Sequence, residues 1–95
     1  MPELQIDFEE GFDGDTVVVS AGGRELWRAG GVTTNLSANV AAVARVDVRG
    51  GAELEVEVPT RRLRATHRVE TPFLEVDVTG GRLVLRPSAE LPRHL

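Results

Sequence analysis

Carboxylates gather near the start of the chain, where five of them fall within nine residues around a turn at Gly14. They are Asp7, Glu9, Glu10, Asp13 and Asp15. Calcium takes about six to eight hard oxygen ligands, which carboxylates beside a glycine turn can supply. We interpret these residues as solvated strand residues and turn formers, and predict no cofactor. The alternative is a calcium-stabilised structural module with Asp7, Glu10, Asp13 and Asp15 as the candidate ligands, although the spacing is not that of an EF-hand.

Histidine is the side chain best suited to acid–base catalysis near neutral pH, and the chain has two, His67 and His94. His67 falls on the apolar side of an alternating run, and His94 lies among the last residues. No serine or acidic residue is placed by the sequence to complete a catalytic triad. We therefore predict no catalytic residue, and we interpret His67 as a hydrogen-bonded residue of the core.

Arginines cluster at positions 61, 62, 64 and 68. Guanidinium groups bind carboxylate and phosphate oxygens in pairs, so Arg62, Arg64 and Arg68 are candidate contacts for a protein partner. The default interpretation is a solvated sheet face, on which the glutamates at 53, 55 and 57 neutralise the arginines.

Trp27 is the single tryptophan of the chain. A two-residue loop at Gly22-Gly23 would place it directly opposite Val18. If exposed, Val18 and Trp27 would form an apolar patch for a protein partner, and if buried they would belong to the core. Both faces of this hairpin carry apolar side chains, so both alternatives stay open.

The composition excludes several kinds of chemistry. Cysteine is absent, which excludes disulfides, thiol catalysis and cysteine-ligated zinc. Lysine is absent as well, which excludes Schiff-base chemistry, and the arginine-rich composition suggests a bacterial source. The formal net charge of −4 argues against nucleic acid as a partner, because phosphate binding needs a basic surface.

The length of 95 residues fits a single domain, which we place at residues 1–87 with a C-terminal tail at 88–95. No apolar run approaches the roughly 20 residues that a membrane span requires, so we expect no membrane partner. The first residues, Met1-Pro2-Glu3, lack the basic and apolar regions of a signal peptide. We therefore expect a cytoplasmic protein, with an exported protein or a domain of a longer protein as the alternatives.

Glycine pairs separate runs in which apolar and polar residues alternate, a pattern typical of β-hairpins. Such pairs lie at 22–23, 50–51 and 80–81, and a fourth at 30–31 opens a polar segment that we expect to be mostly loop. The pair at 80–81 predicts a hairpin in which Val78 faces Leu83 and Glu75 faces Arg86.

The pair at 50–51 predicts a second hairpin, between strands at 43–49 and 53–58, in which Val48 faces Leu54. Pro59 ends the latter strand, because proline cannot donate to a ladder. The run at 63–70 either folds back, which brings Glu57 opposite Arg64, or crosses to a second sheet. The sequence leaves these two possibilities open.

Further strands at 4–9 and 16–20 bring the total to about seven or eight, a set that predicts a small antiparallel β-sandwich, with a partly open β-barrel as the alternative. In strand count and turn spacing the chain resembles immunoglobulin and fibronectin type III domains. It lacks the cysteine pair of true immunoglobulin domains, so no functional residue is carried over. We predict a non-enzymatic interaction module that binds an unidentified protein partner or self-associates through an edge strand.

Overall fold

The computed structural model describes residues 3–35, 37–38 and 40–90. In chain order its elements are β1 (Glu3–Phe8), β2 (Asp15–Ala21), β3 (Arg24–Val32), β4 (Ala42–Asp47), β5 (Glu53–Val58), the short 3₁₀ helix η1 (Pro59–Arg61), β6 (Leu63–Arg68), β7 (Phe73–Thr79) and β8 (Arg82–Ser88). Within these residues there is no helix long and apolar enough to cross a membrane.

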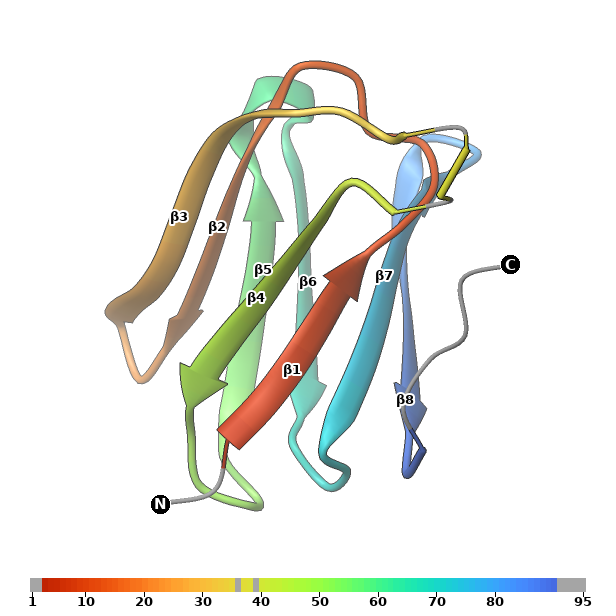
Figure 1. The fold of residues 1–95 in the computed structure, drawn as a ribbon. Helices are drawn as coiled ribbons and strands as arrows, with labels where there is room; N and C mark the ends of the chain where they lie inside the picture. The colour runs from red at the N-terminus through yellow and green to blue at the C-terminus, as the bar shows by residue number, and fades with distance from the viewer. Residues whose placement is uncertain (1–2, 36, 39, 91–95) are drawn as a thin grey trace.

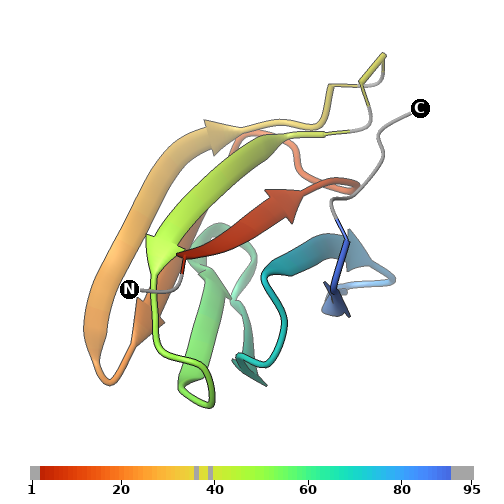
Figure 2. The same cartoon turned by 60° about the horizontal axis from the view of Figure 1, so that its bottom comes forward.

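The described strands form two four-stranded sheets that pack face to face (Figures 1 and 2). Sheet A has the order β4-β1-β7-β8, and sheet B has the order β3-β2-β5-β6. Both sheets are open, which confirms the predicted β-sandwich and not the β-barrel. The first two strands lie in different sheets, whereas they share one in immunoglobulin constant domains. The likeness to that class is therefore confined to the two-layer architecture.

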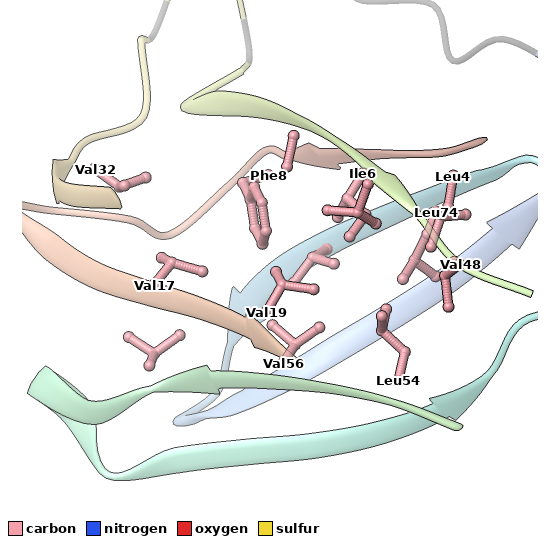
Figure 3. Packing of buried hydrophobic residues seen from close by; sticks show 14 of the residues in the cluster. Leu4, Ile6, Phe8, Val17, Val19, Val32, Val48, Leu54, Val56 and Leu74 are labelled. Atoms are coloured by element: carbon pink, nitrogen blue, oxygen red, sulfur yellow. The ribbon is translucent and has the colours of Figure 1, made fainter. Parts of the chain in front are cut away.

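Alternation along the strands creates the core between the sheets. In β5, Leu54, Val56 and Val58 point inward and are fully buried, while the intervening glutamates point outward. Leu4 and Ile6 of β1 project from the opposite sheet into the same layer (Figure 3). Burial of each such side chain contributes about 1.5–3 kcal/mol to the stability of the fold, so burial of these apolar rows is the main interaction that holds the two sheets together.

Two of the predicted glycine-pair hairpins are present. Gly22-Gly23 joins β2 to β3, and Gly80-Gly81 joins β7 to β8; both pairs have positive φ angles of 59° and 76°. Positive φ at both central residues suits the right-handed twist of the strands they connect. The β7–β8 hairpin has the predicted register, with Val78 opposite Leu83.

The third predicted hairpin is wrong, because β4 and β5 belong to different sheets. Strand β4 pairs with β1 instead, so that Val46 lies opposite Leu4 rather than Val56. The loop with Gly50-Gly51 crosses between the layers, and backbone hydrogen bonds to Val69 hold it there. The predicted cross-strand pair of Val48 and Leu54 therefore does not exist.

The register of the β2–β3 hairpin also differs from the expectation. A register shift between Val19 and Ser20 places Val19 opposite Trp27 and Val18 opposite Arg28, whereas a regular ladder would place Val18 opposite Trp27. An extra residue in one strand reverses the faces of every later residue. Trp27 consequently points into the core.

One pair of strands is parallel, an exception to the predicted antiparallel arrangement. Strand β1 lies beside β7 at the centre of sheet A, with Ile6 opposite Leu74. Beyond β1 the chain turns toward sheet B at Gly11, where φ is 88° and a Cβ atom would lie 2.0 Å from the carbonyl oxygen of Val78. Only glycine fits this close approach.

Strand β6 folds back on β5, which decides between the two possibilities at Pro59. Glu57 lies opposite Arg64, and Glu53 lies opposite Arg68. The last strand, β8, continues through Pro87 to Ser88, the first residue of the predicted tail. Proline is tolerated there because β8 is an edge strand.

Candidate interaction site

Asp15 lies at the start of β2 and binds η1, the segment between β5 and β6. Its buried carboxylate accepts hydrogen bonds from Arg61 Nε at 3.0 Å, Thr60 Oγ1 at 2.7 Å and the backbone N–H of Asp13 at 2.9 Å. An ion pair of 2.9 Å joins it to the Arg61 Nη2 atom. These contacts fix the connection between β5 and β6 to the start of β2, at the same end of sheet B.

The environment of Asp15 favours its ionised form. Burial raises the pKa of the Asp15 carboxyl, but the hydrogen bonds from Arg61, the backbone of Asp13 and Thr60 together outweigh burial and hold this pKa below its usual 3.8. Asp15 is therefore a charged structural residue whose oxygens are occupied by protein donors.

Arg86 on β8 is held by three carboxylates of the described residues. Its Nη1 atom lies 2.6 Å from Asp77 Oδ2, and its Nη2 atom lies 3.1 Å from Glu9 Oε1 and 3.2 Å from Glu75 Oε2. Asp77 also accepts a hydrogen bond from the Glu10 N–H at 2.9 Å. The cluster ties the end of β1 and the loop beyond it to the β7–β8 hairpin.

The four candidate calcium ligands do not converge. Asp15 faces Arg61, Asp7 is buried in β1 where Gln5 Nε2 donates to it at 2.9 Å, and Glu10 and Asp13 are exposed in the loop. Among the described residues no three acidic or histidine side chains are placed to hold a metal ion. Calcium binding thus stays an alternative to which the geometry adds no support.

His67 lies where the alternation placed it, on the inward face of β6 opposite Leu54. It is half-buried, and none of the described residues forms a hydrogen bond with it. The expected hydrogen bond to the core is therefore not found, and no acidic or hydroxyl group orients this imidazole for proton transfer.

The arginines that are candidate contacts for a partner lie near the outer face of sheet B. Arg64 is 3.6 Å from Glu55 and 4.0 Å from Glu57, and Arg68 lies opposite Glu53 in the ladder. Arg62 stands apart, at the end of η1 with a positive φ of 56°. Most of this surface therefore has the mixed charge of the solvated-face interpretation. Arg61, left out of the candidate set, makes the strongest contact of the group.

Val18 and Trp27 do not form a shared patch, because they point to opposite faces of the β2–β3 hairpin. Trp27 stacks on Phe8 of sheet A, with ring centroids 5.3 Å apart and an interplanar angle of 11°. Val18 points outward but is almost buried among its neighbours. The apolar partner patch predicted for these two residues is thus absent.

Two hollows on the described surface are large enough to compare with a small-molecule site. One of about 190 Å³ lies between the sheets near Leu4, Val48 and Val69, and one of about 290 Å³ lies on the outer face of sheet B beside Ser20 and Glu55. Small-molecule sites usually measure roughly 300–1,000 Å³. The first hollow is well below this range; the second lies just below its lower limit and is lined by Ser20, Glu53, Glu55 and Thr66 beside the β2–β3 turn.

The edges of the sheets differ in how well they resist an additional strand. β8 contains Pro87, β3 has two register shifts against β2, and β6 presents Arg64 and Arg68. Proline, irregular pairing and like charges all hinder another strand from pairing. The fourth edge, β4, pairs with β1 over six consecutive residues without a register shift, and it contains neither proline nor glycine.

The outward row of β4 consists of Val43, Arg45 and Asp47. Val43 is 43% exposed, and among the described residues it is the single large apolar residue that is exposed. Neither Arg45 nor Asp47 forms an ion pair or a hydrogen bond with a described side chain. The alternation in the sequence already placed these residues outward. The wrong pairing of 43–49 with 53–58 concealed that they lie on an edge.

No family model, no curated protein and no solved structure matches this chain. Its function must therefore be inferred from the geometry of the fold, and most of all from β4.

Proposed function

We propose that this protein is a non-enzymatic interaction module that binds an extended segment of a protein partner along β4. The observation that carries the proposal is the regular edge of this strand, beyond which sheet A has no other described strand and on which the side chain of Val43 is exposed. An edge strand presents unpaired N–H and C=O groups, and an added strand satisfies them with main-chain hydrogen bonds.

The rest of the described surface supports binding rather than catalysis. The arginines with the closest contacts, Arg61 and Arg86, are occupied by carboxylates of the same chain. The hollows are small, and His67 has no orienting partner among the described residues. Strand addition needs none of these groups, because its affinity comes from the backbone and its specificity from alternate side chains.

The proposal can be tested with an end-blocked peptide that alternates valine and threonine and carries a lysine at each end. We expect titration of this peptide to shift the amide NMR signals of β4 and its neighbour β1, and to leave those of β3, β6 and β8 in place. Shifts centred on another edge, or none at millimolar peptide, would overturn the proposal.

Matched variants sharpen this test. A lysine at an edge discourages strand addition, so Val43→Lys should weaken peptide binding by about tenfold. Thr66→Lys places the same side chain at an exposed outward position of β6 and should leave binding unchanged. Equal effects of the two variants would show that charge alone, and not the β4 edge, controls binding.

A further inference from the structure

We propose that the strand received by β4 is β4 of a second copy of this chain, paired antiparallel with Val46 on the two-fold axis. This inference rests on the proposed function and names its partner. The dimer would join the two copies of sheet A into one continuous eight-stranded sheet, twice the four strands of each. A two-fold interface of this kind uses the same surface on both subunits.

Charge complementarity identifies the partner. Arg45 and Asp47 lie two positions apart on the outward row of β4, with opposite charges and no ion pair to a described residue. When two antiparallel copies pair about Val46, Arg45 of each faces the partner's Asp47. Both charges of both subunits then lie beside an opposite charge, an arrangement that stabilises a sheet.

Other registers are less favourable. In antiparallel pairing, directly opposite residues share a face, so a symmetric dimer must be centred on one residue. If the pairing is centred on Arg45, this arginine lies opposite the arginine of the second copy. If it is centred on Asp47, the two aspartates lie opposite each other. Centring on Val43 or Ala44 leaves Asp47 without an opposite charge. Only Val46 as the centre pairs both charged residues of β4.

The same register also provides a contact for Val43 on the second copy. Val43 would face the partner's Arg49, whose aliphatic stem can cover the exposed methyl groups. On the inner face, Val46 would face its own copy and Ala44 would face the partner's Val48, which extends the apolar row of each core across the dimer. An interface of this length is small, so we expect dimers at protein concentrations on the order of 0.1 mM and above.

Charge reversal tests the inference directly. Residue 45 of each copy faces residue 47 of the other, so Arg45→Asp places two aspartates opposite each other and Asp47→Arg places two arginines opposite each other. Either variant should therefore raise the dimer dissociation constant about tenfold or more. The double variant R45D/D47R should dimerise like the parent. A mixture of the two single variants should form a heterodimer, because each supplies the charges that the other needs. Analytical ultracentrifugation measures all four cases. Failure of the double variant and of the mixture to associate would overturn the register.

Single cysteines give an independent test, because the natural chain contains none. A disulfide requires Cα atoms within about 7 Å, and in a symmetric dimer only the central residue lies that close to its own copy. Mild oxidation should therefore cross-link Val46→Cys, and not Val43→Cys, Ala44→Cys or Arg45→Cys. A cross-link at one of the other positions would overturn the Val46 register.

The two proposals can fail separately. If the parent chain stays monomeric to about 1 mM and none of the cysteine variants cross-links, β4 does not bind its own copy. Peptide-induced shifts confined to β4 and β1 would then preserve strand capture from another protein. If such shifts are also absent, both proposals are wrong.

Discussion

Arg45 and Arg86 lie on the outer face of sheet A, at its two opposite edges. On β8, Arg86 reaches three carboxylates, and its neighbour Pro87 removes one backbone donor. On β4, Arg45 and Asp47 have no such partners among the described side chains, and every residue of the strand retains its N–H group. The same sheet thus has one edge whose charges are satisfied within the chain and one edge whose charges are not. We infer that charges at an edge protect a monomer where they are paired internally, and specify a partner where they are not.

The largest effect should come from Asp15, the carboxylate with the most donors and the counterpart of the Arg86 cluster in sheet B. We expect Asp15→Asn to lower the free energy of unfolding by about 2–3 kcal/mol at pH 7, because hydrogen bonds to a buried charge are lost. Urea denaturation of both proteins measures this difference.

The pH dependence of that difference follows from the lowered pKa of Asp15. Since the folded pKa lies below the unfolded value of about 3.8, ionised Asp15 stabilises the fold above that pH. The contribution is lost as the pH falls through the folded pKa. The difference in the free energy of unfolding between the parent and Asp15→Asn should therefore be constant near neutral pH and should disappear below pH 3.8. A difference that persisted at the lowest accessible pH would show that the packing of the Asp15 side chain, and not its charge, stabilises the fold.

A matched pair of substitutions tests the two edges of sheet A. Asp77→Ala leaves Arg86 and the Glu10 N–H without a main acceptor, and it should cost about 1–2 kcal/mol, because solvent reaches half of the Arg86 side chain. Asp47→Ala removes an exposed carboxylate and should change stability by less than about 0.5 kcal/mol. Thermal unfolding at low protein concentration compares them as monomers. Equal losses would contradict the difference between the edges.

The smallest effect should come from Pro87→Val, which makes β8 chemically more like β4. We expect stability to change by less than about 0.5 kcal/mol, because Pro87 is exposed. The alternating valine–threonine peptide should begin to shift amide signals of β8 in this variant. If no amide signal of β8 shifts, the charges around Arg86 are sufficient to prevent strand addition at this edge without the proline.

The sequence predicted those parts of the fold that depend on short-range chemistry. Gly80-Gly81 predicted its hairpin and register, because the twist and the apolar alternation on both sides agree with one loop length. Gly50-Gly51 carries the same signal but crosses between sheets. The apolar row of Ala44 and Val46 fits that of Leu4 and Ile6 as well as that of Val56, so alternation alone cannot choose.

The candidate site was harder to predict for the same reason. Arg61 and Arg86 find their carboxylates through the packing of distant segments, and no local spacing encodes those contacts. The bulge in the β2–β3 hairpin, which turned Trp27 inward, likewise has no turn residue to mark it. The outward position of Val43 was readable from alternation, but the exposure of β4 as an edge depended on which strand pairs with it.

The parallel pair of β1 and β7 has a consequence for the order of folding. Ile6 and Leu74 meet across most of the chain, so the centre of sheet A cannot close until β7 has been synthesised. Until then the apolar row of β1 has only β4 beside it and no strand on its other side. Pairings this distant in sequence are slow to form, typically on the millisecond-to-second scale, and they leave strand edges exposed meanwhile. The edge of β4 thus belongs to the β1–β4 pair, which can form before β7 is available. At that stage a nascent chain is most prone to pair with another chain.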